Sequence, residues 1–550
     1  MRLRVSFAVA VMTTILVGLG TAPSQAAAGG ATIRPLRECA ELIGDFRLPS
    51  GGAHVTAATP VPAGADEPAH CDVRGYVDPA VRFQLRLPTS TFAGRYLQYG
   101  CGGFCGQLDT PAFPECGGPP GADMAVAATD DGHVGTGILA NLDGAWAANN
   151  RAARDDWAFR APHVVSQAAK QLIAAYYGSP PSRSYFTGCS NGGREALLLA
   201  QRYPRDFDGV IAGAPAFAIA QLGGVYETWL ARTNTAPDGT PVLTSEKLVP
   251  LHDAVVAACD GLDGLVDGQL AEPRACRFDP AVLACANGAD RPDCLTPAQV
   301  GAVRKLYAGP TDPRGRRLYP GGQPYGSELA WEAWVVPIPE IGASISGLLG
   351  DNYLRYIGYP IGTPHSSLAE FQFTLAEFDR LRAEGVRSAA TSLDLSRFRR
   401  AGGKLIIWHG WADSAIPPTG TLDYYQRLWQ RDGGLRGTQQ YARVFMVPTL
   451  YHCAGGSALT EFDPLPELVR WVERGAAPDR VTAVGRAEPQ GPVVRSRPVF
   501  PYPLRARYDG SGSTDDASNF VPVAPPGRPH DVIDWAGNDL YGGPPGPVSL

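Results

Sequence analysis

Two dipeptides in the chain each join a cysteine to a residue that can take part in nucleophilic catalysis. Cys189-Ser190 lies inside the segment 188–192, and His452-Cys453 follows far later in the chain. A disulfide between the two cysteines would hold their Cα atoms within about 4.4–6.8 Å. Ser190 and His452 are direct neighbours of these cysteines, so the same bond would bring the serine and the histidine together. The two dipeptides therefore predict a catalytic serine and its base.

The segment 188–192 matches the pattern G-x-S-x-G. Its glycines allow a tight turn that exposes the serine Oγ, provided that a strand comes before the turn and a helix after it. The apolar residues 184–187 predict that strand, and the Ala- and Leu-rich segment 193–203 predicts the helix. We therefore predict that Ser190 is a nucleophile on a strand-to-helix elbow, with an ordinary turn serine as the alternative.

The base of such a nucleophile needs a carboxylate that orients it. In this arrangement the partners follow in the order Ser, Asp, His after successive strands. Asp413 follows a predicted strand at 403–408, and His452 follows another at 443–447. We predict Asp413 as the orienting acid, although an aspartate capping a loop turn would look the same. His409 is a competing base, but it ends a strand and is interpreted as a packed core histidine.

The oxyanion that forms when a serine attacks a carbonyl must be met by N–H donors that are already in place. The backbone amide of Asn191, directly after the nucleophile, is the first candidate. The second is expected in the glycine-rich loop after a predicted strand at 96–99, where Gly102 and Gly103 are equally suitable.

A second group of residues indicates a metal site. The segment 259–269 carries three aspartates separated by glycines, and its spacing is not that of an EF-hand. Carboxylate and carbonyl oxygens are the ligands that Ca²⁺ prefers. The predicted ligands are the side chains of Asp260, Asp263 and Asp267 with the carbonyls of Leu265 and Gln269, in a loop closed by Cys259 and Cys276. The alternative is a solvated acidic turn, and the expected role of the calcium is structural.

Strands and helices alternate along much of the chain. Besides the segments above, 125–128 and 209–213 predict strands, and 161–177 and 464–474 predict helices. This order indicates a parallel α/β sheet. The segment between the two halves is richer in Cys, Trp, Gly and Pro and is expected to form a lid over the carboxyl ends of the strands. The predicted division is a catalytic domain at 27–219 and 396–520, a lid domain with the calcium loop at 220–395, and an irregular tail at 521–550.

The first residues, 1–26, have the basic start, apolar centre and small-residue end of a secretory signal peptide. The net charge of −6 gives no reason to expect nucleic acid or a membrane as partner. Secretion favours disulfides among the 11 cysteines. Closeness in sequence suggests the pairs Cys39–Cys71, Cys259–Cys276 and Cys285–Cys294. Cys101, Cys105 and Cys116 compete for one further bridge, whose pairing the sequence does not fix; Cys105–Cys116 is the pair that we expect.

These motifs resemble the tannase and feruloyl esterase family, which also contains an esterase of mono(2-hydroxyethyl) terephthalate. The resemblance rests on the Cys-Ser, Asp and His-Cys arrangement, the segment 207–215 and the aspartate-rich loop. It implies an α/β-hydrolase domain, a calcium-carrying lid and hydrolysis of aromatic acid esters. It also implies the triad Ser190, Asp413 and His452, the Cys189–Cys453 bridge and the calcium ligands given above.

The expected substrate is a small ester of an aromatic acid such as ferulate or gallate, of plant cell-wall or tannin origin, with no organic cofactor. Ile416, Trp331 and Trp334 are candidate walls of the substrate pocket. A serine peptidase or an acyltransferase would use the same triad. A catalytically inactive, secreted, calcium-dependent binding protein is the alternative from another class.

Overall fold

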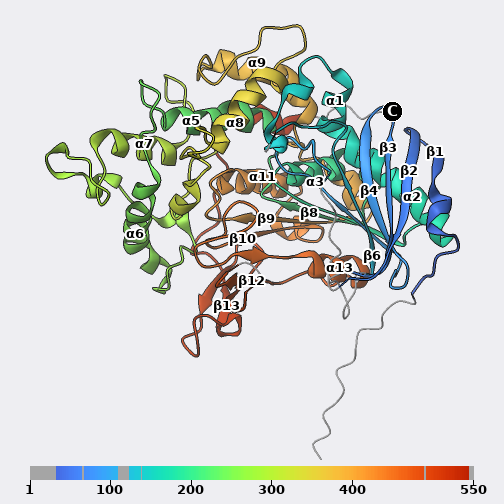
Figure 1. The fold of residues 1–550 in the computed structure, drawn as a ribbon. Helices are drawn as coiled ribbons and strands as arrows, with labels where there is room; N and C mark the ends of the chain where they lie inside the picture. Colours follow the sequence, from blue (N-terminus) through green and yellow to red (C-terminus); the bar gives the residue numbers. More distant parts are fainter. Residues whose placement is uncertain (1–31, 65–66, 109–122, 138, 489–490, 544–550) are drawn as a thin grey trace, which may run out of the picture.

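The computed structural model describes residues 32–64, 67–108, 123–137, 139–488 and 491–543 (Figure 1). The predicted signal peptide and Cys116 lie outside these ranges.

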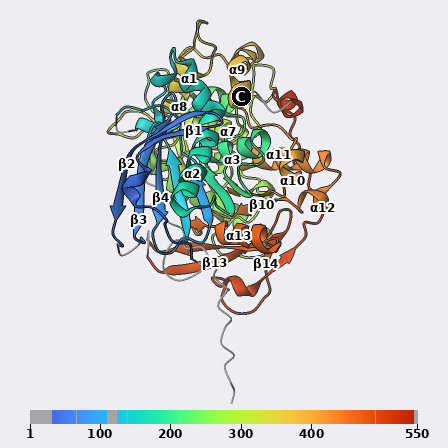
Figure 2. The ribbon, with the colours of Figure 1, turned by 90° about the vertical axis from the view of Figure 1, so that its right-hand side faces the viewer.

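A sheet of 10 strands forms the centre of the molecule, in the order β1-β2-β3-β4-β6-β5-β7-β8-β9-β10. The N-terminal strands pair antiparallel with their neighbours as far as β6, and lie at one edge of the sheet (Figure 2). From β6 to β10 all neighbours are parallel. The strands are β1 Gly44–Leu48, β2 Gly51–Val61, β3 His70–Val77, β4 Val81–Pro88, β5 Arg95–Tyr99, β6 Met124–Thr129, β7 Arg183–Cys189, β8 Gly209–Gly213, β9 Lys404–Gly410 and β10 Ala442–Val447.

Consecutive residues of the parallel strands supply two different apolar cores. In β8, Val210 and Ala212 belong to the core on one face, whereas Ile211 belongs to the core on the other. Successive side chains of a strand point to opposite faces of a sheet, so a strand buried on both faces is apolar throughout. This explains why the short apolar segments predicted as buried strands form the centre of the sheet.

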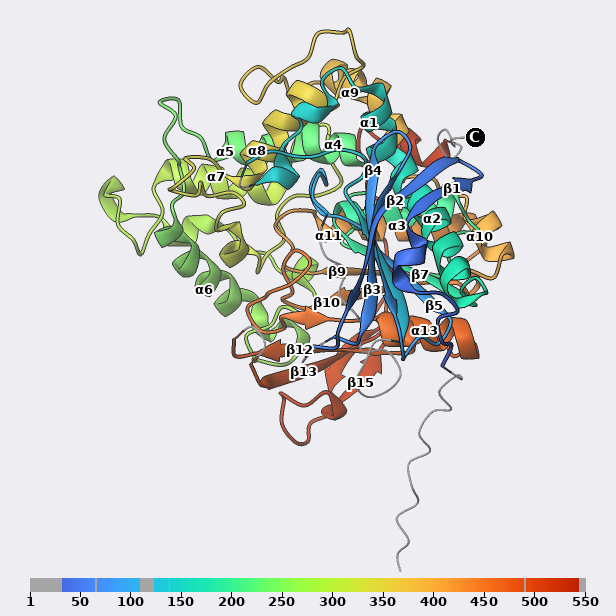
Figure 3. The same ribbon diagram turned by 45° about the vertical axis from the view of Figure 1, so that its right-hand side comes forward.

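Helices cover both faces (Figure 3). The helices α2 (Ala161–Tyr177), α3 (Asn191–Arg202) and α11 (Pro418–Arg431) pack in the larger core, and α13 (Leu465–Arg474) packs in the other. Helices on both faces of a largely parallel sheet define the α/β class. The prediction of an α/β fold is therefore confirmed, and the sequence patterns placed the central strands within two residues of their observed ends.

The chain between β8 and β9 forms a long helical insertion. Its α- and π-helices include α4 Ile219–Gln221, the π-helix η5 Leu222–Glu227, α5 Thr228–Thr233, α6 Leu248–Cys259, α7 Pro297–Ala308, α8 Ile345–Asn352, α9 Leu375–Ser388 and α10 Ser396–Arg400. Most of these helices fall within the predicted lid segment. Among them, α5, α6 and α7 lie on the side of the molecule away from β1–β4 (Figure 1).

Beyond β10 the chain adds two small antiparallel sheets. One contains β11 Glu461–Phe462, β12 Val481–Arg486 and β13 Val493–Val499, and the other contains β14 Arg505–Tyr508 and β15 Phe520–Val523. The segment after β15 has little regular structure but packs firmly, because Trp535 and Tyr541 are buried. Trp535 contacts Phe378 of α9, with ring centroids 6.1 Å apart, so the C-terminal segment is held against the insertion.

Candidate active site

Ser190 stands at the turn between β7 and α3. Its φ and ψ angles of 64° and −121° lie outside the regions that L-residues normally adopt. The Ser190 N–H donates to the Gly213 carbonyl at 2.9 Å, which ties the turn to the neighbouring strand β8. A Cβ at Gly193 would lie 2.2 Å from that same carbonyl oxygen, so only glycine allows this close approach. The strand, strained serine and helix are the context that a nucleophile elbow requires.

His452 and Asp413 form a hydrogen-bonded pair. Nδ1 of His452 lies 2.8 Å from Oδ2 of Asp413, whose side chain is completely buried. The other oxygen, Oδ1, accepts the backbone N–H groups of Ala415 and Ile416 at 2.8 and 2.9 Å. Burial alone would oppose ionisation, but His452 and the hydrogen bonds from His452 and His409 hold the pKa of Asp413 well below its usual range. An ionised Asp413 fixes the ring and tautomer of His452.

His409 is a second partner of the same carboxylate. Its Nε2 lies 3.1 Å from Asp413 Oδ2 and 3.0 Å from the Ile416 carbonyl oxygen. The carbonyl can only accept, so we assign the ring proton to Nε2, and Nδ1 then accepts from the Thr421 hydroxyl at 2.8 Å. His409 is fully buried. It is thus a core histidine, as interpreted from the sequence, but it also supports the orienting acid.

Ser190 and His452 line one cavity of about 430 Å³. Cys189 and Cys453 line it too and are joined by a disulfide with a Cα–Cα distance of 5.8 Å. The predicted pairs Cys39–Cys71, Cys259–Cys276 and Cys285–Cys294 are likewise joined. The structure therefore brings together the serine, histidine and aspartate that the sequence singled out.

The predicted oxyanion residues Asn191, Gly102 and Gly103 also line this cavity. Gly103 has a φ of 60°, and a Cβ there would lie 2.3 Å from the Asn141 carbonyl oxygen. The loop thus needs glycine at 103, whereas a Cβ at Gly102 would meet no atom within 4 Å. Both glycines remain candidates for the second donor.

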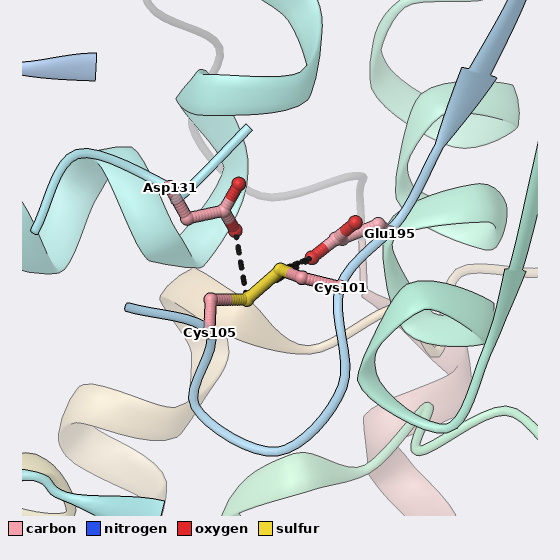
Figure 4. Close-up of side chains that lie close together, drawn as sticks. All are labelled: Cys101, Cys105, Asp131 and Glu195. Carbon is pink, nitrogen blue, oxygen red and sulfur yellow. Dashed lines mark hydrogen bonds between the residues drawn. A yellow bond between two sulfur atoms is a disulfide. The ribbon is translucent and has the colours of Figure 1, made fainter. Parts of the chain in front are cut away.

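A buried polar cluster lies behind the oxyanion loop (Figure 4). Cys101 and Cys105 form a disulfide, so the prediction of a Cys105–Cys116 bridge is wrong. Their sulfur atoms contact Glu195 Oε1 at 3.1 Å and Asp131 Oδ2 at 3.4 Å, respectively. A bridge between residues this close in sequence fixes the loop that carries Gly102 and Gly103.

The side chain of Asn191 is hydrogen-bonded on two sides, by Glu195 of this cluster and by the neighbouring Arg194. Its Nδ2 donates to Glu195 Oε1 at 2.7 Å, and its Oδ1 accepts from Nε of the buried Arg194 at 2.7 Å. Burial raises the pKa of Glu195 to about 7, and burial together with Glu195 raises the pKa of Asp131. Two carboxyl groups this close and this deeply buried favour a state in which they share a proton.

Two of the three predicted pocket residues line the cavity, namely Trp334 and Ile416. Trp334 also contacts the His452 ring, with centroids 5.4 Å apart. The prediction for Trp331 is wrong: its side chain is fully buried and its Nε1 donates to Ser327 Oγ at 2.9 Å. Trp331 belongs to the core of the insertion.

The predicted calcium loop follows α6 and is closed by the Cys259–Cys276 disulfide. Asp260 accepts the N–H groups of Gly268 and Gln269 at 2.9 and 3.2 Å, and Asp267 pairs with Arg497 at 2.5 Å. Burial raises the pKa of Asp263, and the charges of Asp267 and Asp260 add to this effect.

Four of the predicted ligand residues line one small cavity, and Oε1 of Gln269 is buried without a hydrogen-bond partner. These four are Asp263, Leu265, Asp267 and Gln269. Asp260, Asp263 and Asp267 all lie in the described part of the chain, but their carboxylate oxygens are not all within 4.8 Å of one another. The predicted ligand atoms are all oxygens, which hard cations prefer. The negative charges of Asp260 and Asp267 act against ionisation of Asp263, and a bound cation would offset them.

Sequence reasoning missed several residues of the site. Glu227 and Asn141 line the cavity, Glu195 accepts a hydrogen bond from Asn191, and Asp131 contacts Cys105. None of them stands in a motif. The predicted helix at 193–203 begins after Asn191, and only the earlier start observed for α3 places Glu195 one turn after Asn191.

Comparison with known proteins agrees with this geometry. The family model described as tannase and feruloyl esterase matches residues 67–523. An uncharacterized esterase of Xanthomonas campestris pv. campestris is 34% identical over 89% of this chain and 91% of its own length. The mono(2-hydroxyethyl) terephthalate hydrolase of Piscinibacter sakaiensis is 33% identical over 86% of this chain and 87% of its own.

The crystal structure of feruloyl esterase B from Aspergillus oryzae superposes with a TM-score of 0.73 and 27% identity, covering 87% of this chain and 98% of that one. None of the helices in the described residues has the length and apolar character needed to cross a bilayer. The protein is a carboxylic ester hydrolase and belongs to the tannase and feruloyl esterase family.

Proposed function

We propose that the protein is a secreted serine esterase that hydrolyses esters of phenolic and other aromatic acids. The observation that carries the proposal is the single cavity that contains both Ser190, on its strained turn, and His452, paired with Asp413. The names of the similar hydrolase from P. sakaiensis and the similar feruloyl esterase from A. oryzae support an aromatic ester as substrate.

In the first half of the proposed reaction, Ser190 Oγ attacks the ester carbonyl carbon while Nε2 of His452 accepts the hydroxyl proton. The negative charge that forms on the carbonyl oxygen is stabilised by the N–H of Asn191 and by an N–H of the loop that carries Gly102 and Gly103. The tetrahedral intermediate then breaks its bond to the alcohol oxygen. His452 returns the proton to that oxygen, and the acyl group stays on Ser190.

In the second half, water replaces the alcohol. His452 accepts a proton from the water as its oxygen attacks the acyl carbon, and returns a proton to Ser190 Oγ as the acid leaves. Asp413 stays ionised throughout and stabilises the imidazolium that forms in each half.

A hydrolysis panel of methyl ferulate, methyl gallate and a terephthalate monoester tests the proposal. We expect turnover of at least one ester that disappears in Ser190→Ala. Absence of turnover on all three would contradict the aromatic-ester function. Cleavage of matched amides at comparable rates would instead indicate a peptidase. Ligand binding that is unaffected by Ser190→Ala, with no turnover in either the unmodified protein or the variant, would indicate a binding protein.

The proposal includes a structural calcium ion held by the side chains of Asp260, Asp263 and Asp267 with the carbonyls of Leu265 and Gln269. When bound, the ion supplies positive charge to an acidic loop and fixes it. Support comes from the donor set and from the raised pKa of Asp263, for which burial and the neighbouring aspartates are the cause.

Secretion rests on the signal-like residues 1–26. Expression of the full chain followed by N-terminal sequencing of protein from the medium tests it. A mature chain that begins near residues 26–28 is expected, and retention of the intact start in the cell would contradict secretion.

A further inference from the structure

The walls of the active-site cavity are mostly apolar. Outside the elbow, the oxyanion loop and His452, the polar side chains among the described residues that line it are those of Asn141, Glu227 and Trp334. Neither lysine nor arginine is present among these described lining residues. A substrate in this cavity therefore meets few polar groups and no neutralising cation.

Glu227 enters the cavity from the π-helix η5, and Ile219 and Gly223 line it from the same helical face. Single π-turns within helices are frequent at functional sites. The residue as a whole is only 2% exposed. Its Oε2 accepts the indole N–H of Trp334 at 3.1 Å, and the Trp334 ring in turn lies 5.4 Å from the His452 ring. The carboxyl group is thus fixed by a tryptophan that itself contacts the ring of the proposed catalytic base.

The surroundings of Glu227 favour its neutral form. Burial raises the pKa of Glu227 well above its usual range, Asp413 raises it further, and only the Trp334 hydrogen bond opposes the shift. A neutral carboxylic acid offers one O–H donor and keeps acceptor capacity. A hydroxyl group also offers both, so the two groups are complementary.

We infer that Glu227 is a specificity-determining residue that selects esters whose acyl aromatic ring carries a hydroxyl and disfavours those whose ring carries a carboxylate. The inference rests on the proposed function. A ring hydroxyl can both donate to Glu227 and accept from it. A ring carboxylate has no donor, and it would place a negative charge near Asp413 in a cavity whose described walls hold no lysine or arginine.

Three methyl cinnamates with hydrogen, hydroxyl or carboxylate at ring position 4 provide the test. The measured quantity is kcat/KM for each ester and the ratio between them. In the unmodified enzyme we expect the hydroxylated ester to exceed the unsubstituted one by about tenfold or more, as for one hydrogen bond in a buried site. The carboxylated ester is expected to be the poorest of the three.

Glu227→Met keeps the size of the side chain and removes its hydrogen-bonding groups, so the hydroxyl-to-hydrogen ratio should fall to about one. Glu227→Gln keeps a donor and an acceptor and should retain most of the selectivity. Glu332→Met, on an exposed glutamate of the same segment as Trp334, is the matched control and should show the unmodified ratio.

A hydroxyl-to-hydrogen ratio near one in the unmodified enzyme would overturn the inference without any variant, so the test does not depend on Glu227→Met folding. An unchanged ratio in a folded Glu227→Met, or a loss of selectivity in Glu227→Gln equal to that in Glu227→Met, would overturn it as well. If no cinnamate is hydrolysed in a Ser190-dependent way, the proposed function fails. If all three are hydrolysed without preference, only the role of Glu227 fails.

Discussion

At the scale of single residues, Asp413 stands out because both of its carboxylate oxygens accept hydrogen bonds. One oxygen accepts two backbone N–H groups, and the other accepts from both His452 and His409. A carboxylate with this many donors stays ionised although it is completely buried. The residue therefore has one role toward the base and another toward the loop that carries it.

Replacing Asp413 with Asn should reduce kcat by about 10⁴-fold, because the amide offers His452 a donor and stabilises the wrong tautomer. His409→Gln should cost only roughly tenfold, since it removes one hydrogen bond to Asp413 and leaves the one from His452. Steady-state kinetics on any ester that the enzyme turns over measures both. Equal losses in the two variants would contradict the secondary role of His409 and would mean that its hydrogen bond to Asp413 is as important for catalysis as the carboxylate itself.

At the scale of elements, the catalytic groups stand at the carboxyl ends of parallel strands. Ser190 follows β7, Asp413 follows β9 and the oxyanion loop follows β5. The strand pattern made these positions predictable, because apolar segments bounded by glycine indicate buried strands and fix where each one ends. The same reasoning could not separate Trp331 from Trp334. Which of two nearby tryptophans faces a cavity depends on the tertiary packing of an irregular segment.

The Cys101–Cys105 bridge and the contacts of Glu195 escaped prediction for a related reason. Both depend on how the loop that carries Gly102 and Gly103 folds against α3. A local sequence pattern does not show how close two elements lie in the folded protein. Three cysteines in one glycine-rich segment allow several pairings, and the folded path of the loop decides among them.

The pair Asp131 and Glu195 makes stability depend on pH. Because the pKa of Glu195 is raised by burial to about 7 in the folded protein, the unfolded chain releases this proton at lower pH than the folded one. The free energy of unfolding should therefore decrease as pH rises from about 4.5 towards 7. Glu195→Gln should show a smaller decrease over that interval, measured by urea unfolding at several pH values. An identical pH dependence in the two proteins would mean that Glu195 ionises freely in the fold.

The Cys189–Cys453 disulfide should matter more for turnover than for folding. Mild reduction, verified by counting free thiols, is expected to lower kcat while the far-ultraviolet circular dichroism persists, because the bond joins the neighbours of Ser190 and His452. Activity that survives verified reduction of this bond would contradict the prediction.

Paired alanine variants give the control for that experiment. Loop-closure entropy assigns about 6 kcal/mol of stability to the Cys189–Cys453 bond and about 3 kcal/mol to the Cys285–Cys294 bond, so kcat is compared at a temperature at which both variants are folded. The Cys285→Ala/Cys294→Ala protein should keep its kcat, since both residues lie outside the active-site cavity, whereas Cys189→Ala/Cys453→Ala should not.

At the scale of the whole molecule, the insertion is tied to the rest of the protein at several points. Arg497 of β13 pairs with Asp267 of the predicted calcium loop, and Trp535 of the C-terminal segment contacts Phe378 of α9. The order of elements and the parallel sheet were predictable from the chain. The packing of the C-terminal segment was not predictable. Its many prolines and glycines indicate irregular structure, and no local pattern shows that two of its aromatic residues are buried.

Removing calcium should lower the melting temperature by several degrees, since a ligand that binds only the folded state stabilises it. A chelator with calcium add-back, followed by calorimetry, measures the shift. Asp263→Ala should abolish the response to calcium, and the exposed Asp253→Asn on α6 should retain it. A melting temperature that is insensitive to the chelator and to added calcium would contradict the proposed ion.

The connectivity of the Cys189–Cys453 bond has a consequence for how the chain matures. Four other cysteines lie between its two ends, and they pair among themselves as Cys259–Cys276 and Cys285–Cys294. If the chain is secreted as proposed, it enters an oxidising compartment from its N-terminus and presents Cys189 long before Cys453, so the first cysteines that Cys189 can reach are wrong partners. Correct pairing then requires thiol–disulfide exchange. Production of active enzyme should therefore depend on a disulfide isomerase, and not on an oxidant alone.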